Sequence, residues 1–293
     1  VPERNRDSPY YDRQIPAWTT LNPDRQRDLV RRMATYSAMV EIMDRNIGRV
    51  IDDLSKRNEL KQTLIVFLSD NGACAEWDPL GFDDNPYPIN RLYRGSMLDQ
   101  MGSRGTFHSY GTGWANACNT PFRLYKHYNH EGGISTPLIM HWPNGLERRG
   151  EIDRRPAHVM DLAATLLELG DARYPEHHNG KQVLPLSGRS LLPVFTNQPS
   201  EERAIFFEHE GNRAVRKGKW KIVWTNFDQR WQLYQIDSDR SELNDRAKDF
   251  PDKVKELDEL WLQWSQTHFV EQEKVVQPET GMPKIYYTRD RTK

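Results

Sequence analysis

The chain has 293 residues, of which 37% are hydrophobic and 28% are charged, and its formal net charge is −1. Lysine and arginine are interspersed with aspartate and glutamate, so the sequence offers no basic stripe for nucleic acid and no polybasic segment for an anionic membrane surface. The longest purely apolar run, residues 64–68, is far too short to span a bilayer. We therefore expect neither nucleic acid nor a membrane as a partner.

A long helix is predicted over residues 23–60. Pro23 and Asp24 are a helix start signal, and apolar residues recur at helical spacing from there to Leu54. We expect this apolar face to lie in the core. Its members are Leu29, Met33, Tyr36, Met39, Val40, Met43, Ile47, Val50, Ile51 and Leu54.

A short strand is predicted directly after this helix. Residues 64–68 are apolar without alternation, which is typical of a buried strand in a parallel sheet. Residues 73–119 then lose periodicity and contain many glycines and prolines, and an irregular stretch of this length inside a compact domain is usually functional. Within it, Asp83-Asp84-Asn85 is predicted to be a solvated turn.

Strand and helix alternate in the next part of the chain. Residues 135–143 have the pattern of a short strand, and residues 161–170 have that of a helix with Asp161 as N-cap and Gly170 as C-cap. Strand, helix and strand in succession predict an α/β layer architecture.

A second domain is predicted after a linker at residues 195–203. Three segments there alternate like strands separated by glycine-containing or polar turns, and an amphipathic helix follows them. In chain order they are "RAIFFEH", "RAVRKGKWKIVWT", "WQLYQID" and the helix "DKVKELDELWLQWSQTHF". We therefore expect an α/β domain over residues 1–197 and a smaller α+β domain, an antiparallel sheet plus a helix, over residues 198–293.

Asp70 and Asn71 directly follow the strand predicted at residues 64–68. In open α/β sheets, ligands bind at the carboxyl ends of strands. A carboxylate and a carboxamide oxygen are hard donors that suit Ca²⁺ or Mg²⁺. The alternative for an isolated Asp-Asn-Gly sequence is an Asx-type turn with no ligand.

A second polar segment lies immediately before the strand predicted at residues 135–143. Here Lys126 precedes Glu131-Gly132-Gly133. Beside a divalent cation, the compact ammonium charge of a lysine is suited to bind one oxygen of a tetrahedral anion. The two glycines permit a close approach of the backbone. A solvated lysine on a loop is the alternative.

Together these segments resemble the sulfatase family, in particular arylsulfatase-like enzymes of the alkaline phosphatase superfamily. Their order and spacing carry the resemblance more than any single segment does. The segments are "YSAMVEIMDRNIGRVIDDL", "LIVFLSDNG", "NTPFRLYKHYNHEGGISTPLI", "HVMDLAATLLEL", "LSGRSLLPVF", "FFEHEGNRAVRKGKWKIV" and "WQLYQIDSDRSELND". The resemblance implies an α/β fold that is part of an alkaline-phosphatase-like sandwich, with a smaller C-terminal α+β domain.

The resemblance also implies how the two polar segments act. Asp70 and Asn71 would ligate a divalent cation, Ca²⁺ with Mg²⁺ as the alternative, and Lys126 would contact the sulfate group. The implied activity is the hydrolysis of sulfuric esters, with an aryl or a carbohydrate sulfate as the substrate.

Three further residues fall in segments that line the family's substrate pocket. They are His108, His209 and Asn212. A purely structural role is an equal alternative for each of them.

The family's nucleophile is a formylglycine made from the Cys or Ser of a Cys/Ser-x-Pro-x-Arg motif. Neither Cys74 nor Cys118 begins this motif, although the sequence after Cys118 misses it by one residue. We therefore expect this chain to be the C-terminal portion of a sulfatase, inactive alone, with the nucleophile in an upstream half of the same protein. The resemblance suggests a periplasmic or secreted enzyme, and the first residues of this chain lack the apolar core of a signal peptide.

Two other functions stay open at this point. One is a phosphodiester or phosphonate hydrolase of the same superfamily, because the same site geometry suits phosphoryl groups. The other is a noncatalytic glycan- or metal-binding protein that keeps the scaffold without the nucleophile. A Cys/Ser-x-Pro-x-Arg motif in the upstream coding sequence would favour the sulfatase.

Overall fold

The structure is a computed structural model that describes residues 15–75, 79–83, 90–147, 149–226, 228–268 and 270. The described residues divide into two compact units. One unit contains those within the ranges 1–47, 71–137 and 204–293, and the other contains those within 48–70 and 138–203. The domain boundary predicted between residues 197 and 198 stays a prediction.

The long helix α1 spans Pro23–Lys56 and confirms the helix predicted over residues 23–60. It follows a short 3₁₀-helix, η3, at Trp18–Thr20. The Asn22 side chain caps its start, because Asn22 Oδ1 accepts a hydrogen bond from the Arg25 backbone N–H at 2.9 Å. After its last turn the chain turns away at Asn58, whose φ of 58° is the left-handed conformation typical of helix ends.

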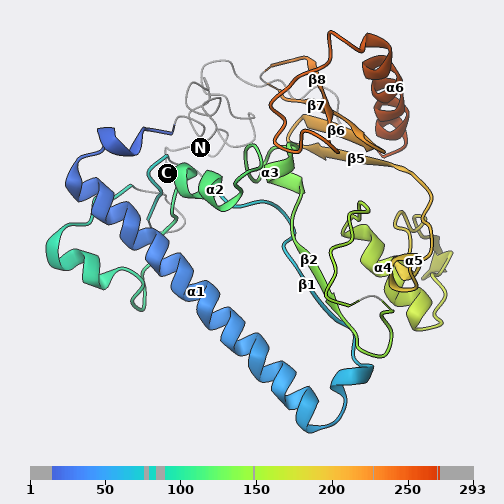
Figure 1. Ribbon diagram of the computed structural model, residues 1–293, viewed down its shortest axis with the longest axis horizontal. Coiled ribbons are helices and arrows are strands. Elements are labelled where there is room, and N and C mark those ends of the chain that lie inside the picture. Colours follow the sequence, from blue (N-terminus) through green and yellow to red (C-terminus); the bar gives the residue numbers. More distant parts are fainter. Residues whose placement is uncertain are drawn as a thin grey trace. The chain divides into compact units, whose positions relative to one another are not determined.

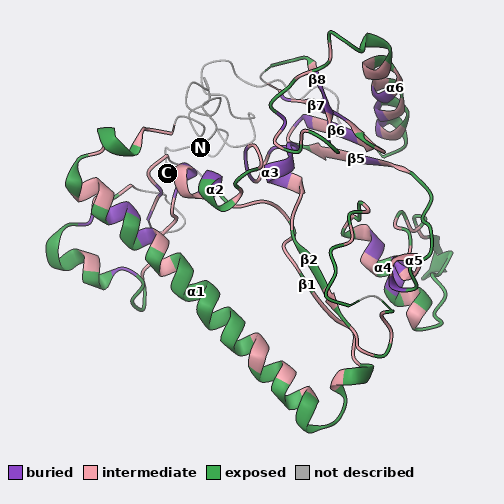
Figure 2. Cartoon of the chain, viewed as in Figure 1, coloured by how far each residue is buried: buried purple, intermediate pink, exposed green. Residues whose placement is uncertain are grey.

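Half of the ten residues predicted for the apolar face of α1 are exposed, so the expectation that this face lies in the core was wrong for much of its length (Figure 2). Leu29 is buried, with 6% of its surface exposed. The exposed members are Tyr36, Met39, Val40, Met43 and Val50. Periodicity shows that a helix has an apolar face, but it does not supply the surface that covers that face.

A four-stranded antiparallel sheet, in chain order, confirms the sheet predicted for the C-terminal part. The strands are β5 (Ala204–His209), β6 (Asn212–Lys217), β7 (Trp220–Trp224) and β8 (Trp231–Gln235). Helix α6, Pro251–Thr267, packs on one face of this sheet (Figure 1). The core between them contains Val215, Ile222, Leu233, Leu257 and Trp261, each with 0% of its surface exposed.

In the other unit, β1 (Ile65–Leu68) pairs antiparallel with β2 (Leu138–His141). Both strands were predicted, but the prediction that the first is buried in a parallel sheet was wrong. Phe67 is 37% exposed, and β1 has one described neighbour strand. An apolar run without alternation indicates a strand; the direction of its partner is decided by chain connectivity.

The same unit contains further short elements, and α4 (Met160–Leu169) confirms the predicted helix. Gly170 is its C-cap as predicted, whereas Asp161 is not its N-cap, because Val159 holds that position. Asp161 lies in the first turn, where its carboxylate accepts the His158 backbone N–H at 2.8 Å. The other elements are η4 (Leu60–Gln62), β3 (His177–His178), β4 (Lys181–Gln182) and α5 (Leu192–Phe195).

The stretch predicted as irregular, residues 73–119, contains η5 (Gly95–Gln100) and α2 (Thr112–Cys118). The predicted solvated turn was wrong for Asp83, which is fully buried. Its Oδ2 lies 2.7 Å from Arg32 Nη2 on α1, and this ion pair compensates the burial of both charges. Asp84 and Asn85 lie outside the described residues.

None of the helices in the described parts of the chain combines the length and the apolar character that crossing a bilayer requires.

Candidate functional site

Lys126 belongs to a segment, residues 122–135, that packs on the face of the β5–β8 sheet opposite α6. The Arg123 guanidinium donates a hydrogen bond to the Tyr234 hydroxyl at 3.0 Å. Lys221, from β7, places its Nζ 2.9 Å from Glu131 Oε1. Tyr234 and Lys221 both point away from the α6 side of the sheet, since their neighbours in the strands face α6. The sheet therefore supports residues 122–135, which we call the Lys126 segment.

A buried charge cluster fixes the end of the Lys126 segment. Lys221 Nζ lies 2.9 Å from a carboxylate oxygen of Glu131 and 2.9 Å from one of Glu242. Burial by itself raises the pKa of Glu131, but the Lys221 ammonium, together with the charges of Arg216 and Arg240, outweighs burial and leaves this pKa below its ordinary value. Burial raises the pKa of Glu242 despite the same ammonium. Breaking such a cluster would leave a buried charge unpaired, so the segment is held firmly in place.

The glycines predicted to allow a close backbone approach do so. The Gly72 backbone N–H donates to the Gly133 carbonyl at 2.9 Å. A Cβ atom on Gly72 would lie 1.8 Å from the Gly132 carbonyl oxygen, and one on Gly133 would lie 1.8 Å from the Tyr128 carbonyl oxygen. Such distances are far below van der Waals contact, so no other residue type fits at these positions without moving the backbone.

The close contact between these glycines also places the backbone around Asn71 beside the backbone around Lys126. The Lys126 N–H donates to the Ala73 carbonyl at 3.1 Å. The Asn119 side chain accepts the Ala73 N–H at 3.1 Å and donates to two carbonyls of the Lys126 segment. Asp70, which immediately precedes Asn71, is exposed. The assignment of Asp70 and Asn71 as metal ligands, and of Lys126 as a sulfate contact, stays a prediction.

His209 and Asn212 also lie at the Lys126 segment. They face each other at the tip of the β5–β6 hairpin, across a turn made by Glu210 and Gly211. Asn212 Nδ2 donates to the His127 carbonyl at 3.0 Å. Three of the residues predicted from different segments, Lys126, His209 and Asn212, are thus brought to one region, although their roles in a pocket stay predictions.

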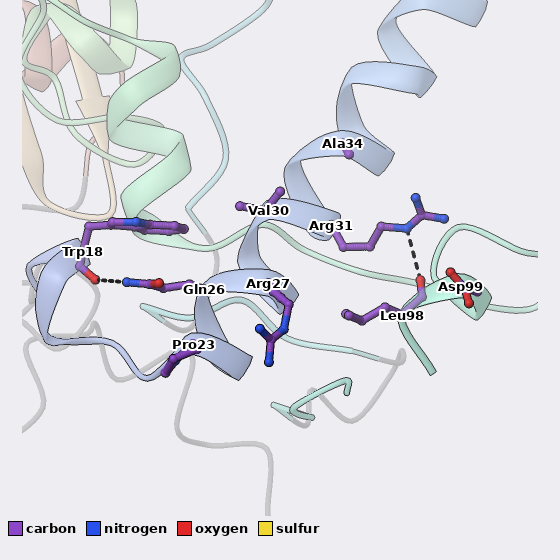
Figure 3. Close-up of a pocket in the computed structure, with 9 residues that line it drawn as sticks. All are labelled: Trp18, Pro23, Gln26, Arg27, Val30, Arg31, Ala34, Leu98 and Asp99. Atoms are coloured by element: carbon purple, nitrogen blue, oxygen red, sulfur yellow. Dashed lines mark hydrogen bonds between the residues drawn. The ribbon is translucent and has the colours of Figure 1, made fainter. Parts of the chain in front are cut away.

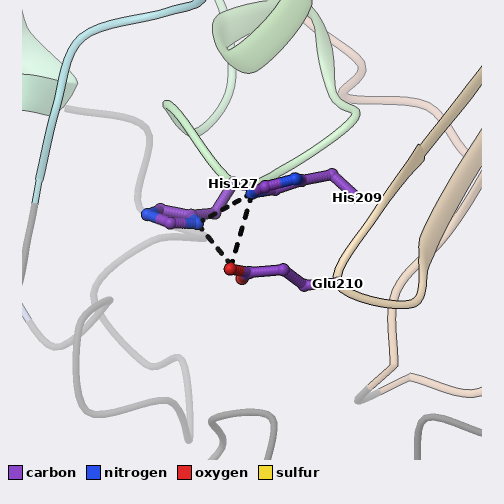
Figure 4. A group of neighbouring side chains, drawn as sticks. All are labelled: His127, His209 and Glu210. Carbon is purple, nitrogen blue, oxygen red and sulfur yellow. Dashed lines mark hydrogen bonds and ion pairs between the residues drawn. The ribbon is translucent and has the colours of Figure 1, made fainter. Parts of the chain in front are cut away.

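Two residues of this region were missed by sequence reasoning. His127 Nδ1 lies 3.1 Å from His209 Nε2 and 3.1 Å from Glu210 Oε2 (Figure 4). Partial burial lowers the pKa of His209, and the Glu210 carboxylate offsets this only in part. A signal for Glu210 was available, because an x-Gly pair between two alternating strands predicts a tight hairpin that gathers its flanking side chains. For His127 the only signal was its position next to Lys126.

His108 has a different environment. Its Nδ1 lies 2.6 Å from Asp83 Oδ1, and its ring packs edge-on against Tyr93. Asp83 is in turn paired with Arg32. These contacts support the structural alternative for His108, and its predicted place in a substrate pocket stays a prediction.

A separate hollow lies along the first turns of α1 (Figure 3). Its walls include Trp18, Val30, Arg31 and Leu98, and the Arg31 Nε donates to the Leu98 carbonyl at 3.1 Å. None of the predicted site residues lines this hollow. It therefore does not bear on the candidate site.

Comparison with known proteins decides the family. The Sulfatase family model matches residues 3–172, and the model of the N-sulphoglucosamine sulphohydrolase C-terminal region matches residues 122–267. The chain belongs to the sulfatase family. The second match begins in the Lys126 segment and ends at Thr267, the last residue of α6, so it includes the whole β5–β8 sheet.

Several sulfatases are similar to this chain. An uncharacterized sulfatase of Schizosaccharomyces pombe is 34% identical over 270 residues, which cover 89% of this chain and 48% of that protein. An arylsulfatase of Klebsiella aerogenes is 35% identical over 189 residues, covering 64% of this chain and 40% of that protein. This chain thus spans about half the length of the curated sulfatases it matches.

A solved structure shares the fold. The crystal structure of Ps i-CgsB superposes with a TM-score of 0.59 at 25% sequence identity, and the match covers 89% of this chain and 47% of that one. Another structure of Ps i-CgsB contains k-i-k-neocarrahexaose, an oligosaccharide. The mixed α/β fold with a C-terminal sheet and helix, predicted as part of an alkaline-phosphatase-like sulfatase, is confirmed.

Proposed function

We propose that this chain contributes part of the active site of a sulfuric ester hydrolase. The observation that carries the proposal is the backbone hydrogen bond from Lys126 to Ala73, at 3.1 Å. This hydrogen bond connects Lys126 to the residue that follows the Asp70-Asn71-Gly72 motif. The Asp70 and Asn71 side chains suit a cation, and the Lys126 side chain suits an anion. Membership of the sulfatase family supports sulfate as that anion.

Lys126 is proposed to bind the sulfate group. Its ammonium is a compact positive charge, which offsets the negative charge that develops on the sulfate oxygens as the ester bond breaks. The buried cluster around Lys221 and Glu131 holds its segment against the sheet. The backbone therefore does not have to be reorganised during the reaction, which is the condition for strong electrostatic stabilisation.

Asp70 and Asn71 are proposed to contribute two ligands to a divalent cation, Ca²⁺ or alternatively Mg²⁺. Their carboxylate and carboxamide oxygens are the donors that such ions prefer, and Gly72 after them lets the chain turn closely against Gly132. Two donors are fewer than the roughly six to eight oxygens that Ca²⁺ takes, so further ligands are required. When bound, the cation would draw negative charge from the sulfate oxygens.

The nucleophile stays an expectation. No Cys/Ser-x-Pro-x-Arg motif occurs in these 293 residues. A formylglycine from elsewhere in the protein would supply the attacking group, and hydrolysis by this chain alone is not expected. A phosphodiester or phosphonate hydrolase and a noncatalytic binding protein are the alternatives, and neither has better support from the relatives.

The substrate is proposed to be an aryl or a carbohydrate sulfate. The similarity to the Klebsiella aerogenes arylsulfatase supports the first class, and the similarity to Ps i-CgsB, which binds an oligosaccharide, supports the second. A panel of aryl sulfates and sulfated sugars, assayed with one enzyme preparation, would separate the two.

The decisive experiment replaces Lys126 with alanine in the active enzyme. We expect kcat/KM for sulfate ester hydrolysis to fall by about 10²-fold or more, the usual cost of removing one group that stabilises transition-state charge. Lys181→Ala, at an exposed lysine of β4, is the matched control and should leave kcat/KM unchanged. A fall in kcat/KM of less than about threefold would be small for a group that stabilises transition-state charge. It would show that Lys126 is a solvated side chain.

The cation is tested separately by Asp70→Ala. Loss of the anionic donor should remove both bound Ca²⁺ and hydrolysis while the circular dichroism spectrum is retained, because Asp70 is exposed. Metal content is measured by atomic emission on the purified protein, with Asp52→Ala, at an exposed position of α1, as control. Unchanged Ca²⁺ content and activity in Asp70→Ala would support the Asx-type turn instead.

A further inference from the structure

We propose that His127, His209 and Glu210 form a binding site for a divalent transition metal ion, of which Zn²⁺ is the best fit. The three side chains come from two segments that are far apart in sequence, and Figure 4 shows them turned toward one another. The proposal concerns donors other than Asp70 and Asn71. It does not rest on the proposed sulfatase activity.

The distances between the three donor groups match those in a metal coordination shell. His127 Nδ1 lies 3.1 Å from His209 Nε2 and 3.1 Å from Glu210 Oε2, and His209 Nε2 lies 3.6 Å from Glu210 Oε1. Zinc bonds to imidazole nitrogen and carboxylate oxygen are about 2.0–2.2 Å, which places neighbouring donors of a tetrahedral ion about 3.3–3.6 Å apart. Movements of a few tenths of an ångström would therefore complete the site.

The chemical nature of the donors selects the metal. Two imidazoles and one carboxylate are a common ligand set for zinc sites that keep a fourth position open to water. Imidazole nitrogen suits Zn²⁺ and other transition metals, whereas Ca²⁺ and Mg²⁺ bind oxygen donors. The trio and the oxygen donors of Asp70 and Asn71 should therefore select different ions.

The hairpin tip presents two of the donors on a fixed backbone. Glu210 and Gly211 form the two-residue turn with φ values of 55° and 80°, as the twist of an antiparallel hairpin favours. The Gly211 N–H donates to Glu208 Oε1 at 2.8 Å, and the Asn226 side chain donates to the Glu210 carbonyl. The backbone that carries His209 and Glu210 therefore needs little ordering when a metal binds.

His127 is held in an uncommon conformation. Its φ of 81° is left-handed, which carries a steric cost for a residue with a Cβ atom. The hydrogen bond from Asn212 Nδ2 to its carbonyl, at 3.0 Å, stabilises this conformation. The result is that the ring is presented to the hairpin tip, where the other two donors lie (Figure 4).

The site is open on one side and sheltered on the other. The His209 side chain is 49% exposed, whereas those of His127 and Glu210 are 14% and 10% exposed. A hydrated ion can therefore reach His209 first. The two sheltered donors can then replace further waters of its shell.

In the test, the purified protein is first treated with a chelator and the chelator is removed. The protein is then titrated with Zn²⁺, and binding is measured by isothermal titration calorimetry. We expect one Zn²⁺ site that depends on the trio. His209→Ala and Glu210→Gln should each weaken binding by more than about 100-fold, because the loss of a ligand exceeds the roughly 10- to 100-fold cost of losing an outer-shell partner. His177→Ala, at an exposed histidine of β3, should bind like the unaltered protein.

Three further measurements keep the outcome unambiguous. Co²⁺ should give the visible absorption of a tetrahedral nitrogen and oxygen site, lost in His209→Ala, and thermal melts would show that each variant is folded. Excess Ca²⁺ should not displace Zn²⁺. Equal Zn²⁺ binding by the unaltered protein and His209→Ala, no stoichiometric binding at all, or displacement by Ca²⁺ would each overturn the proposal and leave a hydrogen-bonded trio. Because no substrate is used, failure here leaves the sulfatase proposal untouched, and failure of Lys126→Ala leaves this one untouched.

Discussion

Helix α6, which packs on the β5–β8 sheet, and the long helix α1 differ in how far their apolar side chains are buried. Both α6 and α1 carry apolar side chains at helical spacing. Trp261 of α6 has 0% of its surface exposed, whereas Met39 and Val50 of α1 are 64% and 62% exposed. The pattern along the sequence is alike, and the difference lies in what each helix packs against among the described residues.

Different kinds of contact hold the two regions in place. The sheet and α6 bury an apolar core between two elements that are adjacent in sequence, and burial of large side chains is the main favourable term. The described anchoring of α1 is concentrated near its start, where Arg32 pairs with Asp28 and Asp83. An ion pair positions an element, but it contributes less net stability than an apolar core does.

The largest expected effect is in the sheet. Trp261→Ala should lower the free energy of unfolding by about 3–5 kcal/mol, because it leaves a cavity between α6 and the sheet. Leu262→Ala, at the next residue of the same helix but 36% exposed, is the matched control and should cost much less. Urea unfolding followed by circular dichroism measures both. Equal losses would show that α6 does not pack in solution as described.

The second effect concerns Asp83 and its pH dependence. Burial by itself raises the pKa of Asp83, but hydrogen bonds from Arg32, His108 and the Arg91 backbone, together with the Arg32 charge, outweigh burial and leave this pKa below its ordinary value. The carboxylate therefore contributes stability above its unfolded pKa of about 3.9, and this contribution is lost as the pH falls through the folded pKa. Asp83→Asn should cost about 3 kcal/mol at pH 7, because it leaves the buried Arg32 with one carboxylate.

The difference between the unaltered protein and Asp83→Asn should shrink below about pH 4. Denaturant unfolding at several pH values measures it, with Asp52→Asn, at an exposed position of α1, as the control. A difference that stays constant down to acid pH would mean that the carboxylate charge is not what stabilises Arg32.

The smallest expected effect is on the exposed face of α1. Met39→Ala and Val50→Ala should change the free energy of unfolding by less than about 0.5 kcal/mol, because exposed positions lose little burial and alanine favours helix. Leu29→Ala, at a buried position of the same helix, should cost about 2–5 kcal/mol and serves as the contrast. A loss above about 1.5 kcal/mol at Met39, typical of buried sites, would show that this face is covered in solution.

The elements themselves were largely predictable. The C-terminal sheet was predicted from three alternating segments, the second of which contains both β6 and β7. Helices α1 and α6 follow from periodicity over neighbouring residues, and Gly170 ends α4 as predicted. The errors concern partners. β1 was recognised as a strand, but its antiparallel pairing with β2 depends on residues about seventy positions away. Asp83 looked solvated because its partner, Arg32, lies on a helix far back in the chain.

The candidate site shows the same division. From the sequence alone, Asp70, Asn71 and Lys126 are predicted as site residues, and these roles stay predictions. The sequence also predicted the glycines whose close approach the structure bears out. Only the tertiary structure decided that His127 meets His209 and Glu210, and that His108 lies beside Asp83 instead. The physical reason is the sequence range over which each effect acts. Backbone sterics and alternation act over a few residues. Side chains some eighty positions apart meet only when the Lys126 segment packs against the sheet that carries the hairpin tip.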